Sequence, residues 1–128
     1  MLVVDASALV VAVTDTTERG ATVRAELLDG VAAPHLVDAE CGQALRGLAR
    51  REVLPADLAE RSLVLARDLV TQRYPVAPLQ TRAWALRDNL SFYDATYVAL
   101  AEVLDVRLLT ADRRLASAPG PECPIHLV

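Results

Sequence analysis

The chain has 128 residues, of which 53% are hydrophobic and 23% are charged. A chain of this length and composition buries a core of its own and needs neither a disulfide nor a metal ion to fold. The net charge is −4, and all 13 basic residues are arginines. These properties exclude a uniformly basic nucleic-acid binder and any site that requires a lysine, such as a P-loop or a Schiff base.

Short apolar segments alternate along the chain with longer segments of helical periodicity. Strands are predicted at residues 2–4 and 106–109, with weaker candidates at 31–33, around 76–77 and at 125–127. Helices are predicted at residues 18–28, 35–51, 56–73, 79–89 and 92–104, with prolines and glycines at element boundaries. Strands separated by helices predict one α/β domain over residues 1–128, with a parallel sheet covered on both faces.

The sequence contains no pattern typical of a membrane or export segment. No run reaches the roughly 18 apolar residues that a membrane span needs, and no basic residue precedes the apolar N-terminal segment. Cys41 and Cys123 lack the spacing of metal ligands and form no disulfide framework. We therefore expect a cytoplasmic protein without membrane contact.

Two acidic residues follow predicted strands, which is where open parallel sheets place functional groups. Asp5 follows the first strand and Asp112 follows the strand at 106–109, so the two carboxylates meet if these strands are neighbours. Each residue could instead cap a following helix, one that begins near Ser7 and one that runs through Leu115. The cap is the more ordinary interpretation of either residue alone, although burying Asp5 among Val and Ala needs compensation.

Two further acidic residues lie on predicted helices. Glu40 shares a helix face with the small residue Gly47 and with Arg51, which leaves room for a ligand. A solvated glutamate favoured by the helix dipole is the alternative. Asp94 opens the helix at 92–104, whose nearly continuous apolar surface predicts burial. Ser91 followed three residues later by Asp94 is also an ordinary capping box.

Taken together, Asp5, Glu40, Asp94 and Asp112 predict a cation site. Four carboxylates in one pocket raise one another's pKa values unless a cation is present. Mg²⁺ and Mn²⁺ prefer oxygen ligands, and such sites serve phosphoryl transfer. We therefore expect these residues to be the metal ligands and catalytic residues of a hydrolase that uses metal-activated water.

Four segments together resemble the PIN domain, and more narrowly the VapC-type ribonuclease toxins of bacterial type II toxin–antitoxin systems. They are Asp5-Ala6-Ser7-Ala8-Leu9, Glu40 in a helix that starts after Pro34, Tyr93-Asp94-Ala95, and Thr110-Ala111-Asp112-Arg113-Arg114-Leu115. None of these segments is specific alone, but their order and spacing span nearly the whole chain.

The resemblance implies a three-layer α/β/α fold with a five-stranded parallel sheet. It implies a Mg²⁺- or Mn²⁺-dependent endoribonuclease, whose acidic cluster is supported by the hydroxyls of Ser7 and Thr110. It further implies a homodimer, a cognate antitoxin protein that covers the site, and a structured RNA substrate such as tRNA.

An acidic chain must contact RNA through local arginines. The candidates are Arg46, Arg50, Arg51, Arg82, Arg87, Arg113 and Arg114. For each one alone, a solvated charge or an ordinary ion pair is the more common role. Trp84, Tyr74, Tyr93 and Tyr97 are interpreted as packing residues rather than as stacking platforms for bases.

Two alternatives belong to other function classes. An aspartyl phosphatase of the haloacid dehalogenase type would use Asp5 as its nucleophile, but Ser7 stands where its acid–base Asp would be, and no Lys follows. A catalytically inert PIN-like binding module would have no reason to keep four acids together. A separate expectation concerns the antitoxin, which is expected to cover part of an apolar helix surface. That surface is formed by Leu27, Leu28, Leu63, Leu65 and Leu69.

Overall fold

The computed structural model describes residues 1–128 and places a five-stranded sheet at the centre of the molecule. The strands are β1 (Leu2–Val4), β2 (Val31–Pro34), β3 (Gln72–Tyr74), β4 (Leu108–Thr110) and β5 (Ile125–Leu127). They follow the order β3-β2-β1-β4-β5, and every neighbouring pair is parallel. The three inner strands are buried along their whole length, as expected for a sheet covered on both faces.

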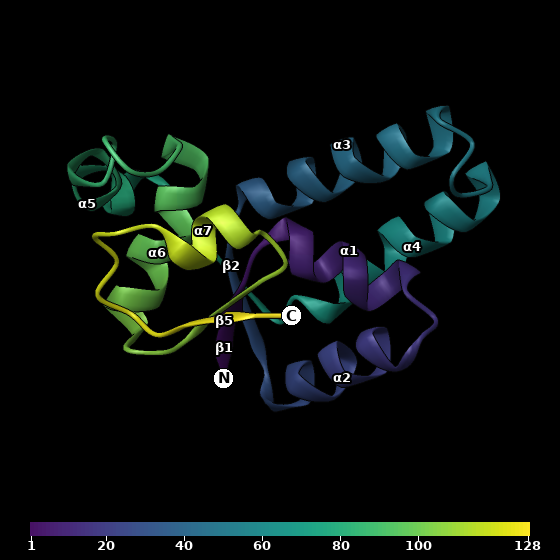
Figure 1. Ribbon diagram of the computed structural model, residues 1–128, viewed down its shortest axis with the longest axis horizontal. Helices are drawn as coiled ribbons and strands as arrows, with labels where there is room; N and C mark the ends of the chain where they lie inside the picture. The colour runs from purple at the N-terminus through teal and green to yellow at the C-terminus, as the bar shows by residue number, and fades with distance from the viewer.

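Helices cover both faces of the sheet (Figure 1). On one side lie α1 (Ala6–Thr14), α2 (Glu18–Glu26), α3 (Leu36–Arg50) and α4 (Ala56–Leu69). On the other side lie α5 (Gln80–Ala85) and α6 (Phe92–Leu104), and α7 (Arg113–Ser117) packs against β4 and β5. The predicted three-layer α/β/α fold is confirmed. None of the helices combines the length and apolar character that crossing a bilayer requires.

The helix α6 is the most deeply buried helix of the fold. Every residue from Ala95 to Ala101 is buried, and the helix packs against β1, β2 and β4. Its bounds agree with the helix predicted at 92–104, because a helix that is apolar all round must be covered on all sides. The position of α6 fixes its first turn, with Asp94, at the edge where the central strands end.

The edge strand β3 corrects two sequence predictions. The helix predicted at 56–73 ends at Leu69, and the strand predicted around 76–77 lies earlier, at Gln72–Tyr74. The residues after Val76 instead form a 3₁₀ turn, η2 (Ala77–Leu79). An edge strand keeps one side in solvent, so exposed Gln72 and partly buried Arg73 gave it no apolar signal.

Other boundaries move by a few residues. The helix predicted at 18–28 ends at Glu26 and continues as the 3₁₀ turn η1 (Leu27–Asp29), the helix predicted at 79–89 is shortened to Gln80–Ala85, and β4 begins at Leu108. The η1 turn buries Leu27, which is 5% exposed, so this residue is not part of an open apolar surface as predicted. Gly30, with φ of +99°, then turns the chain into β2.

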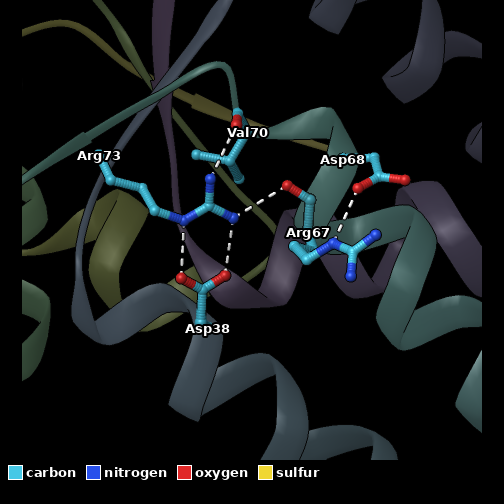
Figure 2. Close-up of polar contacts among 5 residues, drawn as sticks. All are labelled: Asp38, Arg67, Asp68, Val70 and Arg73. Atoms are coloured by element: carbon cyan, nitrogen blue, oxygen red, sulfur yellow. Dashed lines mark hydrogen bonds and ion pairs between the residues drawn. The ribbon is translucent and has the colours of Figure 1, made fainter.

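Arg73 joins β3 to two helices (Figure 2). Its guanidinium donates two hydrogen bonds to the carboxylate of Asp38 on α3, at 2.6 and 2.8 Å. The same group donates to the carbonyl oxygens of Val70 and Arg67 at the end of α4, both at 2.9 Å. Arg73 therefore satisfies backbone acceptors that the end of α4 leaves free, and its charge holds the pKa of Asp38 below its ordinary value.

We expect Arg73→Ala to lower the free energy of unfolding by about 1–3 kcal/mol, since it removes a bidentate ion pair and two carbonyl partners at once. Arg67→Ala is the matched control, because Arg67 is exposed and its side chain pairs only with its exposed neighbour Asp68. We expect the control to change stability by less than about 0.5 kcal/mol. Urea unfolding of both variants measures the difference, and equal losses would contradict the role given to Arg73.

Candidate functional site

The carboxylate of Asp5 lies at the end of the central strand β1, where it is 4% exposed. Its Oδ1 accepts hydrogen bonds from the Ser7 hydroxyl at 2.7 Å and from the Ala8 N–H at 2.9 Å, and its Oδ2 accepts from the Thr110 hydroxyl. Burial raises the pKa of Asp5, and the three donors oppose that rise. A carboxylate has about four lone-pair sites, so one remains for a further partner.

Thr110 connects Asp5 to Asp112. It is the last residue of β4, which pairs directly with β1, and its hydroxyl both donates to Asp5 and accepts the Asp112 N–H at 3.0 Å. Ser7 makes a parallel link, since its hydroxyl accepts the Ala111 N–H at 2.9 Å. The two strands are therefore neighbours, which is the condition under which the two strand-end acids meet.

Both strand-end acids also cap helices, as the ordinary interpretation held. Asp5 is the N-cap of α1 through the Ala8 N–H, and Asp112 is the N-cap of α7 through the Arg114 N–H at 2.8 Å. The two roles are compatible, because each cap occupies only the Oδ1 atom of its carboxylate. Capping therefore orients the carboxylates and leaves lone pairs for other partners.

Glu40 on α3 faces the buried helix α6. The hydroxyl of Tyr97, a side chain with no exposed surface, donates to Glu40 Oε1 at 3.1 Å. Partial burial raises the pKa of Glu40, and the charges of Asp94 and Asp5 raise it further. Glu40 is therefore a partly buried carboxylate that belongs electrostatically to the same group as the other acids.

Asp94 completes the group at the first turn of α6. Its backbone N–H donates to the Ser91 hydroxyl at 3.1 Å, so Ser91 caps the helix, which is one of the two bonds of the capping box considered from sequence. The Asp94 carboxyl stays partly buried, and burial together with the charge of Asp112 raises its pKa. Asp94 and Asp112 both line a hollow of about 280 Å³ that also contains Arg114.

The structure thus gathers all four acids predicted from sequence at one edge of the sheet. Among the charged neighbours that shift the pKa values of Asp5, Glu40 and Asp94, the other acids raise them, and Arg114 alone lowers one, that of Asp94. No three of these carboxylates already surround a single point at ligand distance. The donor set nevertheless fits a hard divalent cation, because it consists of carboxylate oxygens whose mutual repulsion such an ion would relieve.

Of the candidate arginines, Arg114 lies with the acids, in the hollow of Asp94 and Asp112. Arg46, Arg50, Arg51, Arg87 and Arg113 make no ion pair, whereas Arg82 pairs with Glu102 at 2.6 Å, which is the ordinary role considered for it. Arg51 directly follows the last residue of α3, and its guanidinium lies beside Gly47, one turn earlier in the helix. At 1.5 Å per residue, Arg50 lies roughly 15 Å along the helix from Glu40.

Sequence reasoning missed two features of the site. Tyr97 was interpreted as a packing residue, but its hydroxyl is the partner of Glu40. The signal was available in principle, since a tyrosine in a fully buried helix must find a hydrogen-bond partner for its hydroxyl. Trp84 and Tyr93 were also interpreted as packing residues, and this was wrong, because they are 61% and 65% exposed.

We expect Thr110→Val to lower the free energy of unfolding by about 1–3 kcal/mol, because it leaves the buried Asp5 carboxylate and the Asp112 N–H without their shared partner. Thr110→Ser keeps the hydroxyl and serves as the control, with a smaller loss from one missing methyl group. Chemical unfolding followed by circular dichroism measures both. A serine variant as unstable as the valine variant would show that packing, and not the hydroxyl, is what matters at this position.

The structure is a three-layer α/β/α domain with four acids at the carboxyl end of the central strands of its parallel sheet, and the chain belongs to the PIN domain family. The family model matches residues 2–121. The chain is 46% identical over 128 residues to the ribonuclease VapC9 of Mycobacterium tuberculosis, covering 100% of this chain and 98% of that protein.

Two solved structures share the fold. PAE2754 from Pyrobaculum aerophilum superposes with a TM-score of 0.72 and 27% identity, covering 97% of this chain and 81% of that one. VapC20 of Mycobacterium tuberculosis, described as a toxin that cleaves the sarcin–ricin loop, superposes with a TM-score of 0.67 and 19% identity, covering 91% of this chain and 94% of that one. The full-length similarity places the chain among the VapC-type members of the family.

Proposed function

We propose that the protein is an endoribonuclease that acts as the toxin of a toxin–antitoxin pair and depends on Mg²⁺ or Mn²⁺. The observation that carries the proposal is the group of four carboxylates, drawn from β1, α3, α6 and the start of α7, at one edge of the sheet. The name of the relative at 46% identity, a VapC ribonuclease, supports the same activity.

Asp5, Glu40, Asp94 and Asp112 are the residues that would hold the cation. A bound Mg²⁺ or Mn²⁺ would supply Lewis acidity toward the phosphate and a nucleophilic water. The chain itself holds its ligands in place: Ser7 and Thr110 fix the Asp5 carboxylate, and the Tyr97 hydroxyl fixes Glu40. The carboxylates of Asp5, Glu40 and Asp112, the last through the Arg114 N–H, are thus positioned by neighbouring groups before any ligand arrives, which reduces the ordering that binding requires.

The substrate is proposed to be structured RNA such as tRNA. Arg114 lines the hollow that contains Asp94 and Asp112, so a guanidinium stands where a phosphate would enter the site. Arg46, Arg50, Arg51, Arg87 and Arg113 make no ion pair and remain available for more distant phosphates. Local arginines of this kind let an acidic chain bind a polyanion, with an affinity that falls as salt rises.

An antitoxin protein is proposed as the partner, with a homodimer as the functional unit. An apolar hollow of about 640 Å³ lies between α1, α3 and α4, with Leu63 and Val64 in its wall. These two residues are 41% and 44% exposed, and Leu65 and Leu28 are exposed as well. Of the predicted apolar surface, Leu63 and Leu65 on α4 and Leu28 are therefore open, whereas Leu69 is partly buried against the core and Leu27 is buried.

The test is cleavage of total bacterial RNA, with the ends of the products mapped. We expect discrete fragments from one or a few RNA species in Mg²⁺ or Mn²⁺. Phosphate release from small phosphomonoesters, with a phosphorylated Asp5 and no RNA cleavage, would favour the phosphatase alternative. Metal binding without cleavage of any RNA would favour the inert binding module.

A further inference from the structure

Two of the few aromatic side chains, Trp84 and Phe92, line one exposed hollow, and Tyr93 next to Phe92 is exposed as well. The chain has one Trp, one Phe and three Tyr. Trp84, Phe92 and Tyr93, from α5 and the start of α6, are 61%, 37% and 65% exposed. Large aromatic rings are usually buried, because each buries a large apolar area, so three exposed rings on adjacent elements indicate a binding surface.

The residues around Trp84 offer the groups that recognise a nucleobase. Gln80, Thr81, Trp84 and Phe92 line a hollow of about 490 Å³. Two of them are aromatic rings, on which a base can stack, and the other two are an amide and a hydroxyl, which can bond to the edge of a base. No charged side chain lines the hollow, so its chemistry fits a neutral base better than a phosphate.

Arg87 supports the indole of Trp84. Its guanidinium carbon lies 5.0 Å from the ring centroid, and its Nη1 donates to the Trp84 carbonyl oxygen at 3.0 Å. This contact orders the side chain and places a positive charge beside the hollow, where the sugar–phosphate backbone of a bound strand would run. The cation that sequence reasoning assigned to RNA contact is therefore next to the stacking ring.

The hollow adjoins the acidic site through consecutive residues at the start of α6. Phe92, in its wall, follows Ser91, which lines the neighbouring hollow together with Asp94 and Asp112. The two hollows flank the first turn of α6, and a helix with its side chains is roughly 10 Å across. A strand whose phosphate lies at Asp94 can therefore place a neighbouring base against Trp84.

We propose that Gln80, Thr81, Trp84 and Phe92 form a subsite for an unpaired base of the RNA, next to the phosphate that is cleaved. The inference rests on the proposed nuclease function and adds that the substrate must be single-stranded at this point. A base inside a duplex cannot enter the hollow, because its faces are covered by its neighbours and its pairing edge is occupied.

Trp84 fluorescence tests the subsite directly, since it is the only tryptophan. The full-length protein is titrated in EDTA with a single-stranded oligoribonucleotide and with a duplex of the same sequence. We expect saturable quenching by the single strand and little change with the duplex. Because EDTA removes divalent ions, this result does not depend on cleavage, and quenching by a protein that never cleaves RNA would retain the subsite and reject the nuclease.

Substitutions separate stacking from mere contact. We expect Trp84→Ala to weaken binding of a labelled single strand roughly 5- to 100-fold, the range measured for one stacked base, and Trp84→Phe to recover most of that loss. Val103→Ala is the control, because Val103 is 70% exposed near the opposite end of α6.

In cleavage assays Trp84→Ala should raise KM more than it lowers kcat. Gln80→Ala should change the preference among the four bases.

Four outcomes would overturn the proposal. They are equal quenching by single strand and duplex, no quenching by either, unchanged single-strand affinity of Trp84→Ala, and a Trp84→Phe variant as weak as Trp84→Ala. If RNA affinity is unchanged while Trp84→Ala alters the oligomeric state in light scattering, the surface is an interface between copies of the chain. If it instead weakens binding of the antitoxin, the surface belongs to that protein partner.

Discussion

Asp94→Asn is expected to reduce RNA cleavage roughly 100- to 1000-fold, which is the loss caused by removing one preorganised group from an active site. The substitution removes the charge and keeps the size of the side chain. It keeps the helix cap, because the Ser91 hydroxyl accepts the backbone N–H of residue 94, which the substitution leaves in place. A loss of activity would therefore come from the carboxylate itself.

The control is Asp88→Asn, a change of the same chemistry at an exposed residue six positions earlier. We expect this variant to cleave RNA like the wild type, and circular dichroism should show that both variants are folded. If Asp94→Asn retained full activity with the same products, Asp94 would have no part in catalysis. If Asp88→Asn lost activity equally, the effect would reflect net charge and not the site.

Mn²⁺ is expected to raise the melting temperature of the wild-type protein by about 5–10 °C at pH 7.5. A ligand at about 100 times its Kd stabilises a fold by about 2.7 kcal/mol, and a domain of this size shifts by several degrees per kcal/mol. The physical reason is that burial raises the pKa values of Asp5, Glu40 and Asp94 in the folded protein, and neighbouring carboxylates raise them further, so a bound cation offsets an unfavourable charge.

The same pKa shifts predict how this effect depends on pH. Carboxyls with raised pKa values favour the folded state while they are protonated, and this contribution is lost as the pH rises from the ordinary carboxyl range through the folded pKa values. Stabilisation by Mn²⁺ should therefore be larger at pH 7.5 than at pH 5, and smaller in Asp94→Asn at either pH. Equal shifts in wild type and variant would mean that Mn²⁺ binds elsewhere.

Much of the fold is predictable from local patterns. The buried strand β1 and the helix α6 are visible as continuous apolar segments, and the alternation of strands and helices predicts a parallel sheet. The strand β3 is not visible, because an edge strand has polar residues on its open side. Its Arg73 is held by two carbonyl groups at the end of α4 and by Asp38 on α3, and Asp38 lies 35 positions away in the sequence.

The four acids were predicted, whereas the groups that position them were predicted only in part. Asp5 and Asp112 stand out because they follow strands that turn out to be neighbours. Ser7 and Thr110 were implied by the family resemblance, and the structure places both in hydrogen bonds to Asp5. The Tyr97–Glu40 contact joins residues 57 positions apart, on two different helices. Such a contact depends on how helices pack across the sheet, which no local pattern specifies.

The exposure of Trp84 could not be predicted from the sequence. A tryptophan in a short helix next to a buried one is an ordinary packing residue, and the sequence contains no sign that α5 turns its ring outward. Only the burial of Ala83 and Leu86, on the other face of the same short segment, decides which side faces the solvent. The stacking surface thus follows from tertiary packing and not from composition.

Restoration of RNA cleavage by a divalent cation tests the central claim most directly. The protein is treated with EDTA, incubated with total bacterial RNA, and then supplied with Mn²⁺ or Mg²⁺ in excess, with Asp94→Asn in parallel. We predict no cleavage in EDTA, discrete fragments from the wild type after the cation is added, and none from the variant. Undiminished cleavage in EDTA, or equal cleavage by Asp94→Asn, would contradict a cation-dependent site built from these four carboxylates.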